Sequence, residues 1–554
     1  MTRRFFGRSL ALTGICLAFA ASACKKSVPV DPGPPPKPPS IKGFRVDCKG
    51  KTQRISPLIY GVGFDITGYS DWKEPRQWDM RPTARRLGGN AASRYNWDLG
   101  TAFNHGLDWH FENNGDASAK EPFYVSFLRG NAEHHAASAL QIPLLGWVAK
   151  DTTSASFPIT QFPGQKTIDE KRSAGTGVMI SGREIAPPPP TQTSIAATPG
   201  MVATWITKSR AEAAKAGEVP PRIYMLDNES GLWNSTHRDV HPEPATYDEL
   251  LDRTVRYASA VRGADKDGLI AGPNSFGWSE LLYSARDVAM GIGKKPDRLA
   301  HGDVPLLPWY LKKLKEHEDK TTVRLLDIVD VHFYPQGEGM GVGVKGDIDN
   351  DAAARRIRST RALWDPSYVD ESWIHEPVRL LPRLHEWVDQ NYPGRRIEIG
   401  EWNFGAERHM SSGLATAEAL GRFAQGEVFS AFYWPYPALD SAAYWAFRAF
   451  RNFDGKGGAF QDTLVPSEAE EGTSLWVSRD ESGKHLVLVA LNFDPKKEVS
   501  APIDIGSCGE IDKETRYVYA GTGGLAEKPD NATGHVIAGA LPPYSISVYD
   551  VRLK

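Results

Sequence analysis

Short apolar runs that alternate with amphipathic stretches are the feature that most limits how this chain can fold. Helical patterns lie between several of the runs, and 247–261 has its apolar residues on one helix face. Strands that alternate with helices predict an α/β protein with a parallel sheet, and eight units predict a (β/α)8 barrel. An open doubly wound sheet is the alternative, but no glycine-rich phosphate loop follows the first run. The eight runs are 58–62, 86–89, 141–148, 223–226, 269–272, 328–333, 396–400 and 428–434.

A second domain is expected, because 554 residues are too many for one ordinary core. From residue 441 onward the pattern changes to short strand-like runs separated by turn residues, which is typical of an antiparallel β-sandwich. Residues 41–57 also read as strands, so we expect the sandwich to be built from both chain ends, around a barrel over 58–440. The long, proline-rich connection 151–198 follows the third predicted strand and is expected to form one wall of a cleft.

The N-terminus carries the signals of export. Residues 1–23 combine Arg3, Arg4 and Arg8 with a short apolar run and small residues, as in a secretory signal peptide. Small residues directly before Cys24 resemble the processing box of bacterial lipoproteins, in which Cys24 would be lipidated; ordinary cleavage after Ala23 is the alternative. A proline-rich spacer over 24–40 follows. We therefore expect an exported lipoprotein at the outer membrane or cell surface, or otherwise a secreted protein.

The cysteines and the charge balance limit which bonds and binding partners are expected for this chain. Cys48 and Cys508 remain after processing and would form either a disulfide or two free thiols. The chain has 65 basic and 68 acidic residues without a basic stripe, so nucleic acid is not expected as a partner, and we expect a monomer. No His/Cys cluster predicts zinc and no cofactor is expected. The acidic stretch 347–351 has a spacing that calcium could use, but it lacks the other parts of an EF-hand loop, which favours a solvated acidic loop; a structural calcium elsewhere in the chain is left open.

Two glutamates at strand ends are the candidate catalytic pair. Asn228 and Glu229 follow the run 223–226, and Glu401 follows 396–400. In a barrel, these are strands four and seven, whose C-terminal ends face each other across the active face. Hydrolysis of a glycoside needs one carboxylic acid on the leaving oxygen and a second carboxylate at the anomeric carbon. The spacing therefore predicts a barrel glycosidase.

A set of motifs narrows the class of barrel glycosidase, since together they resemble family 44 of the glycoside hydrolases. The motifs span most of the predicted barrel and are specific as a set. They are Arg86-Leu-Gly-Gly-Asn90, Ser93-Arg-Tyr-Asn-Trp97, Asp108-Trp109, Trp147-Val-Ala-Lys-Asp151, Tyr224-Met-Leu-Asp-Asn-Glu229, Asp330-Val-His-Phe-Tyr-Pro335 and Gly400-Glu-Trp-Asn403.

This resemblance implies a barrel with a sandwich built from both ends and a retaining endo-β-1,4-glucanase that acts on polysaccharides such as xyloglucan and carboxymethylcellulose. It also implies that Glu229 is the acid/base and Glu401 the nucleophile. Ser230 departs from the family pattern, which has proline after the acid/base, and this alters the stiffness of the loop more than its chemistry. The proline-rich part of 151–198 also fits the pattern less well.

Other residues are expected to support the pair. Asn228 is placed to bind the sugar 2-OH or the nucleophile, Tyr334 to hold Glu401 ionised, and His332 to bind sugar or tune the acid/base. Further candidates for substrate binding are aromatic or amide side chains near strand ends, which suit a cleft for sugars but would equally pack in a core. They are Trp434, Asn90, Trp97, Trp147 and Trp402.

Two other functions remain open at this point. Within the enzymes, a xylanase or mannanase on the same barrel differs only in subsite residues that one sequence does not identify. Outside the enzymes, the alternative is a lipoprotein whose barrel binds glycans without cutting them. A pure binder has no need for a paired acid and nucleophile, so Glu229 and Glu401 favour the enzyme.

Overall fold

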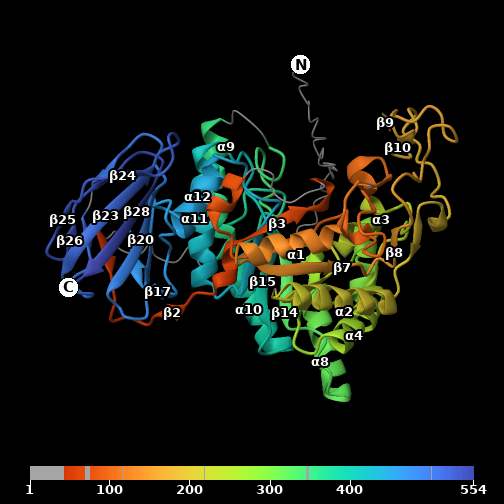
Figure 1. Cartoon of the computed structure of the whole chain (residues 1–554), viewed down its shortest axis with the longest axis horizontal. Coiled ribbons are helices and arrows are strands. Elements are labelled where there is room, and N and C mark those ends of the chain that lie inside the picture. Colours follow the sequence, from red (N-terminus) through yellow and green to blue (C-terminus); the bar gives the residue numbers. More distant parts are fainter. Residues whose placement is uncertain (1–42, 69–74, 117, 218, 345–348, 501) are drawn as a thin grey trace, which may run out of the picture.

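The structure is a computed structural model that describes residues 43–68, 75–116, 118–217, 219–344, 349–500 and 502–554. The predicted signal peptide, Cys24 and the proline-rich spacer lie outside these residues. Within them, a barrel of alternating strands and helices lies beside a sandwich of strands (Figure 1). No helix among the described residues has both the length and the hydropathy needed to cross a membrane.

Eight parallel strands close into a barrel, which confirms the predicted fold class. Each strand pairs in parallel with both neighbours, and β16 returns to β3 to complete the ring. Helices cover the outside of such a barrel and side chains fill its inside, so its strands are buried on both faces and consist largely of apolar residues. The strands are β3 (Gly61–Asp65), β4 (Ala84–Gly88), β7 (Ala137–Ile142), β12 (Ile223–Leu226), β13 (Leu269–Ser275), β14 (Ile328–Phe333), β15 (Arg396–Trp402) and β16 (Ser430–Tyr433).

Two predicted strands have different bounds in the structure. Pro57–Tyr60 forms a short 3-10 helix that Ser56 caps, so the first barrel strand begins later, at Gly61. The third predicted run is split after β7, where Pro143 removes the N–H that a continuing ladder would need. Its second half forms β8 (Trp147–Ala149), which pairs outside the barrel with β11 (Ser194–Ala196).

Helices follow most barrel strands and form the outer layer (Figure 1). Threonine side chains set the starts of two of them, because Thr198 and Thr246 accept hydrogen bonds from N–H groups in the first turns of α2 and α4. The longer helices are α1 (Phe123–Glu133), α2 (Pro199–Ala216), α4 (Tyr247–Ala264), α8 (Leu306–Thr321), α9 (Asn350–Arg358), α10 (Leu380–Asn391), α11 (Met410–Gln425) and α12 (Ala442–Arg451). The shorter ones, which lie in loops, are α3 (Trp233–Thr236), α5 (Trp278–Leu282), α6 (Ala285–Met290) and α7 (Pro296–Ala300).

Helix α12 lies within the range 441–554 that the sequence assigned to the sandwich. It packs against α11, and Tyr444, Phe447 and Phe450 on it are buried in the barrel's outer core. The helix therefore belongs to the barrel layer, and the sandwich strands of the C-terminal part begin at β17 (Thr463–Val465).

The sandwich consists of two sheets that recruit strands from both chain ends. The N-terminal strand β2 pairs with β17, and β1 pairs with β18 and β22. The larger sheet has the order β2 (Gln53–Arg54), β17, β19 (Thr473–Arg479), β20 (His485–Asn492), β28 (Ser545–Leu553), β23 (Ile511–Tyr519) and β24 (Ala526–Lys528). The smaller sheet has the order β18 (Ser467–Glu468), β1 (Phe44–Val46), β22 (Ile503–Asp504), β26 (Val536–Ile537) and β25 (Ala532–Thr533).

Strand β20 shows how the sandwich is joined to the barrel. Leu486 and Leu488 belong to the core between the two sheets, whereas Val487 and Val489 face the barrel helices. Successive side chains on a strand point to opposite faces, so β20 is apolar throughout because both of its faces are covered. Figure 1 shows α11 and α12 between the sandwich and the barrel strands.

A disulfide joins the first and last parts of the described chain. Cys48, just after β1, is bonded to Cys508, just before β23, across a separation of 460 residues. Ser507 strengthens the same junction, since its Oγ accepts a hydrogen bond of 2.9 Å from the Cys48 N–H and donates one of 2.8 Å to the Val46 carbonyl.

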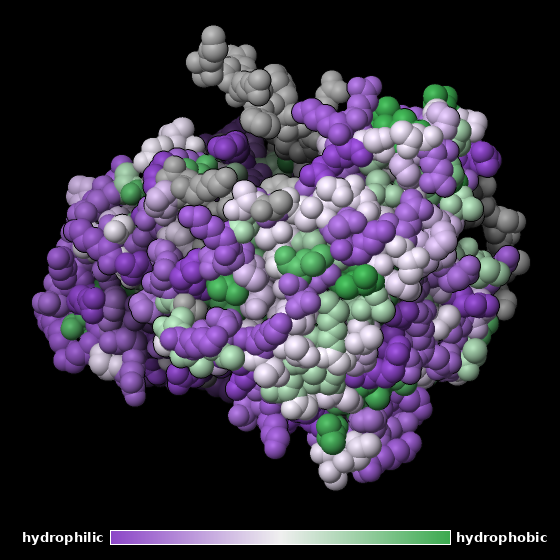
Figure 2. Space-filling model, turned by 45° about the vertical axis from the view of Figure 1, so that its right-hand side comes forward, coloured by the Kyte–Doolittle hydropathy of each residue, from purple (hydrophilic) through white to green (hydrophobic). Residues whose placement is uncertain are grey.

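The connection after β8 forms a small lobe. Strands β9 (Ile168–Asp169) and β10 (Ala174–Gly175) pair within it, and Phe111, Phe157 and Ile185 form a separate apolar cluster. On the face shown in Figure 2, hydrophilic side chains dominate and the apolar ones lie in small separate spots.

Candidate active site

The two predicted glutamates lie where the sequence places them, at the ends of the fourth and seventh barrel strands. Glu229 follows β12 by three residues, with a positive φ of 47°, and Glu401 is the penultimate residue of β15. Barrel enzymes carry their active sites at this C-terminal edge. The side chain of Glu401 is 6% exposed and that of Glu229 is 14% exposed.

A β-bulge turns the Glu401 side chain toward the barrel interior. Asp330 on β14 pairs with Glu398 and Val331 with Ile399, but His332 pairs with Glu401, so Gly400 is an extra residue. Without the extra residue, side chains three positions apart would point to opposite faces of the strand. The bulge therefore lets both Glu398 and Glu401 face inward, and it places Glu401 directly beside His332.

Two donors hold the carboxylate of Glu401. The Tyr334 hydroxyl donates a hydrogen bond of 2.6 Å to Oε2, and the fully buried Arg86 guanidinium donates to Oε1. Burial acts to raise the pKa of Glu401, but the nearby His332 and Arg86, together with these hydrogen bonds, outweigh it and lower that pKa below its ordinary value. Glu401 is therefore a carboxylate held in its ionised form.

Among the described residues, the side-chain hydrogen bond of Glu229 involves one of its two carboxyl oxygens. His332 Nδ1 lies 2.9 Å from Glu229 Oε1 and 3.6 Å from Glu401 Oε2, so the imidazole lies between the two carboxyl groups. The Glu229 N–H donates a 2.9 Å hydrogen bond to the carbonyl of Asn274, a residue at a second bulge, in β13. Its carboxyl therefore keeps an oxygen available for a partner in the cleft.

The three groups are close together. One carboxylate oxygen of Glu229, one of Glu401 and a ring nitrogen of His332 all lie within 4.8 Å of one another. Such a spacing is also found where a metal ion binds, but here Arg86 already places a positive charge on Glu401 and would repel a cation. We therefore interpret the cluster as a pair of carboxyl groups for acid–base and nucleophilic chemistry.

Asn228 and Asn90 are joined through Arg86. The second guanidinium nitrogen of Arg86 donates a 2.8 Å hydrogen bond to Asn228 Oδ1, and Asn228 Nδ2 donates to Asn90 Oδ1 at 3.0 Å. Asn228 is buried and its described side-chain contacts do not include Glu401, so it reaches the nucleophile only through the guanidinium. Gln141 completes the Arg86 contacts at 3.3 Å.

Trp434 follows β16 and lies over the same group. The Arg86 guanidinium carbon is 5.4 Å from the centre of its ring. Two glycines make room for the indole: a Cβ at Gly63 would lie 2.6 Å from it, and a Cβ at Gly89 would overlap the ring. The ring is only partly buried, as expected for a residue at the floor of a cleft.

The other predicted tryptophans differ in their surroundings. Trp402 is fully buried against Phe423, Tyr433 and Phe447. Its neighbour Glu401 faces inward, so Trp402 faces the outer helices, and the prediction that it lines the cleft is wrong.

Trp97 is likewise 5% exposed in the outer core, with the Lys208 ammonium 4.5 Å from its ring, and does not line the cleft. Trp147 is partly exposed at the start of β8 and remains a candidate.

Several residues of the site were missed by sequence reasoning. Arg86 connects Glu401, Asn228 and Gln141, although the sequence only marked it as part of a motif. The signal was available, because an arginine inside an otherwise apolar strand must find buried partners. Asp227 was also missed: its carboxylate accepts hydrogen bonds from Ser93 and from the backbone after β7, and so fixes the chain before Glu229.

The described part of the acidic stretch 347–351 lies at the start of α9, where a loop was predicted from the sequence. Asp349 accepts a 2.7 Å hydrogen bond from the Ala352 N–H and caps α9. Asp347 lies outside the described residues.

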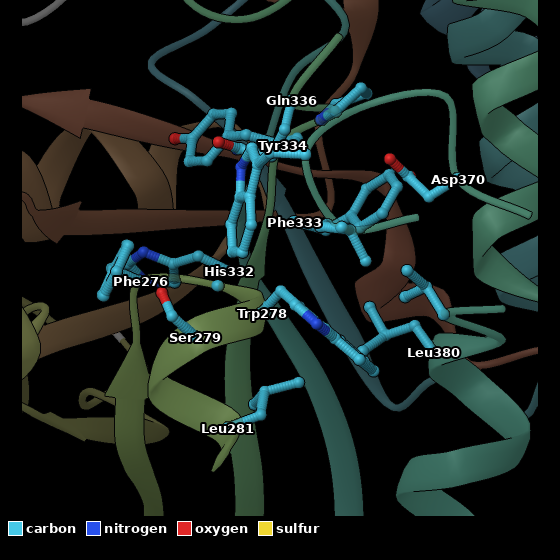
Figure 3. A pocket seen from close by; sticks show the side chains of 15 residues that line it. Phe276, Trp278, Ser279, Leu281, His332, Phe333, Tyr334, Gln336, Asp370 and Leu380 are labelled. Atoms are coloured by element: carbon cyan, nitrogen blue, oxygen red, sulfur yellow. The ribbon is translucent and has the colours of Figure 1, made fainter. Parts of the chain in front are cut away.

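A pocket lined by aromatic side chains adjoins the pair (Figure 3). His332 and Tyr334 form one side of it, and the loops after β13 and β14 form the rest. Trp373, which is 56% exposed, and Trp278 on α5 are among its aromatic residues. The pocket thus reaches the two carboxyl groups through His332 and Tyr334, and Trp434 lies over the Arg86 that contacts Glu401.

A parallel barrel with two neighbouring carboxyl groups at its C-terminal edge is the arrangement of barrel glycoside hydrolases. Comparison with known proteins agrees, since the pattern that defines glycoside hydrolase family 44 matches residues 102–337. A solved bifunctional glucanase-xylanase from a metagenome library is 31% identical, with a TM-score of 0.84, and the match covers 94% of this chain and 100% of that one. The chain belongs to glycoside hydrolase family 44 and is a glycoside hydrolase.

Two further relatives are similar over most of the chain. Endoglucanase A of Paenibacillus lautus is 29% identical over 541 residues, which are 92% of this chain and 72% of that protein. A xyloglucanase of Paenibacillus polymyxa from the same family is 25% identical, with a TM-score of 0.75, and the match covers 93% of this chain and 100% of that one.

Proposed function

We propose that this protein is a retaining endo-β-1,4-glucanase that cleaves xyloglucan, carboxymethylcellulose and related β-1,4-glucans by double displacement. Glu401 would be the nucleophile and Glu229 the general acid/base. The observation that carries the proposal is the separation of the two carboxyl groups, whose nearest paired oxygens lie within 4.8 Å. Retaining glycosidases place the two groups about 5–5.5 Å apart, whereas inverting ones need about 6.5–9.5 Å to admit a water molecule.

The first step follows from the unequal surroundings of the two groups. Glu401, ionised between Arg86 and Tyr334, attacks the anomeric carbon and forms a glycosyl ester. At the same time Glu229 gives its proton to the oxygen of the departing sugar, so the bond to that oxygen breaks without releasing an alkoxide.

The second step reverses the role of Glu229. Its carboxylate takes a proton from a water molecule, which attacks the same carbon and frees Glu401 with the original configuration restored. His332, 2.9 Å from Glu229, is placed to stabilise that carboxylate between the steps. Tyr334 and Arg86 then donate hydrogen bonds to the freed Glu401 carboxylate again, without any rearrangement of the site.

Substrate binding is assigned to the aromatic rings around the pair. Trp434 would support the sugar that is cleaved, while Trp278 and Trp373 would contact neighbouring sugars. Flat rings suit the apolar faces of pyranoses, and rings along a pocket favour a chain over a single sugar. The names of the relatives support a glucan and, for the Paenibacillus polymyxa enzyme, xyloglucan as substrates.

A second activity on xylan is the alternative with specific support. The relative with 31% identity is described as both a glucanase and a xylanase, so one barrel of this type accommodates both sugars. Mannan is a further possibility within the enzyme class, and a glycan-binding lipoprotein without activity is the alternative outside it.

We also propose that the protein is exported and that Cys24 carries a lipid. The basic start, the apolar run and the small residues before Cys24 support this assignment. The proline-rich spacer would then hold the enzyme away from the membrane surface, with the polysaccharide as its partner. Mass spectrometry of the mature N-terminus, with Cys24→Ala as the comparison, tests the lipid.

The deciding experiment measures product release from xyloglucan, carboxymethylcellulose, xylan and mannan, with wild type beside Glu229→Gln and Glu401→Gln. We expect internal cleavage of a β-1,4-glucan and a loss of about 100-fold or more in each variant. NMR of the first product should show the β-anomer before it mutarotates. An α-anomer would exclude the retaining mechanism, full activity of Glu401→Gln would exclude the assigned nucleophile, and binding without cleavage would favour the glycan-binding alternative.

A further inference from the structure

A third carboxyl group, that of Glu280, lies directly behind the acid/base. It is on α5 and is 2% exposed. Nothing in the mechanism above uses it, and among the described residues it has no ion-pair partner. A buried carboxyl group without a cation is costly unless hydrogen bonds compensate for it, so its surroundings show what it holds in place.

Three donors converge on this group, and two of them belong to the two residues after Glu229. The Ser230 hydroxyl and the Gly231 N–H both donate to Glu280 Oε1, the latter at 2.6 Å, and the Phe276 N–H donates to Oε2 at 2.7 Å. The backbone at Gly231 is close to the carboxyl, since a Cβ there would lie 2.9 Å from Glu280 Cδ. Glu280 therefore joins the turn that carries Glu229 to the loop after β13.

The turn needs such support because its backbone is unusual. Glu229 has φ 47° and Asp227 has φ 63°, a backbone region that residues other than glycine rarely adopt. Serine at position 230 supplies a hydroxyl to Glu280, whereas the proline that the family pattern has there would have neither an N–H nor a hydroxyl.

We propose that Glu280 is a positioning residue for general acid catalysis: through Ser230 and Gly231 it fixes the direction of the Glu229 carboxyl toward the leaving oxygen. This role rests on the proposed function of Glu229. The two carboxyl groups also influence each other electrically. Burial raises the pKa of Glu280 to about 7, against the hydrogen bonds that lower it, and the charge of Glu229 adds to the rise.

Glu280 and Glu229 are therefore close enough for their charges to interact. The other titratable groups that face Glu229 are His332, Tyr334 and Glu401. The hydrogen bonds from Ser230 and Gly231 to Glu280 therefore support the position of the Glu229 carboxyl among these groups.

Leaving-group dependence tests this role, because only a poor leaving group needs the acid. Variants Glu280→Gln and Ser230→Ala are compared on two cello-oligosaccharides, one with a sugar as leaving group and one with 2,4-dinitrophenol. We expect kcat/KM to fall by about tenfold or more for the sugar leaving group and by less than about twofold for dinitrophenol. A purely structural role would lower both by the same factor.

Asp287→Asn is the matched control, since Asp287 is also fully buried and accepts backbone N–H groups, but from α7 and not from the residues after Glu229. Asp287→Asn should change kcat/KM by the same factor for both substrates. The inference would be overturned if the Glu280 and Ser230 variants lost kcat/KM by the same factor on both substrates, or lost none. Glu229→Ala separately tests the role of Glu229 as the acid/base. If this variant cleaves glucan normally, the proposed function fails. If it is inactive but the Glu280 and Ser230 variants lose kcat/KM equally on both substrates, only the inference about Glu280 fails.

Discussion

The hydroxyl of Tyr334 donates a 2.6 Å hydrogen bond to Oε2 of Glu401, across from the Arg86 guanidinium on the other carboxylate oxygen. This contact is among the causes that keep the pKa of Glu401 below its ordinary value despite burial. The nucleophile thus depends on donors from two other strands for its charge.

Replacing Tyr334 by Phe should raise the pKa of Glu401, because one hydrogen bond to the ionised form is lost while burial remains. The nucleophile must be ionised to attack, so the acid limb of kcat/KM against pH should move to higher pH. A pH profile from 3 to 8 on a soluble β-1,4-glucan measures this. An unmoved acid limb would mean that Tyr334 does not stabilise the charge on Glu401.

Arg86→Lys should lower kcat/KM by about 100-fold, because a lysine cannot bind Glu401 and Asn228 at the same time. The adjacent Arg85 is the control. It is equally buried but bonds Asn131 on the outer side of the barrel. Arg85→Lys should lower the thermal midpoint yet leave kcat/KM within about twofold at a permissive temperature. Similar kinetic losses in the two variants would contradict the special role of Arg86.

Gly89→Ala should displace the indole of Trp434, because the added methyl group overlaps the ring and the backbone φ is +89°. Loss of the aromatic floor should raise KM for glucan by about tenfold, as judged from steady-state kinetics. Gly217 has a comparable φ of +70° but open space around it. Gly217→Ala should therefore cost about 1 kcal/mol of stability without changing KM, and a KM change there would undermine the interpretation.

Glu112 should make the protein less stable as the pH rises. It is 1% exposed, neither of its oxygens has a hydrogen-bond partner in the described chain, and Arg172 is 3.4 Å away. Burial raises its pKa to about 8, against the effect of Arg172. A raised folded-state pKa means that its contribution is complete below the unfolded value of 4.5 and is lost as the pH rises through about 8.

Glu112→Gln removes the ionisation, so its thermal midpoint should fall less than that of wild type between pH 5 and pH 9. Glu121→Gln, which alters a partly exposed carboxyl paired with Arg129, should follow the wild-type curve. Parallel curves for wild type and Glu112→Gln would show that the Glu112 carboxyl titrates normally.

The barrel could be predicted because its strands are short, largely apolar and separated by amphipathic helices. The direction of single side chains could not. Trp402 was assigned to the cleft because it adjoins Glu401, but the bulge at Gly400 sets which side chain faces inward, and a bulge is not visible in the order of residues. Helix α12 was missed since no helix was expected beyond the last barrel strand.

The contacts of the site are equally non-local. Arg86 and Glu401 are 315 residues apart, and Ser230 and Glu280 are 50 apart, so only the closed barrel brings them together. What the sequence could supply was the residue types at strand ends; which donors hold which carboxyl group depends on the geometry of neighbouring strands.

The bond between Cys48 and Cys508 also determines how the molecule would carry mechanical load. A pull on the segment before β1 reaches Cys48 and passes across the sulfur atoms into the C-terminal strands of the sandwich. The barrel is connected downstream of that junction, so its strands are not in the line of force. Tension applied between the two ends of the described chain would therefore be borne by the sandwich, and the two glutamates in the barrel would keep their spacing.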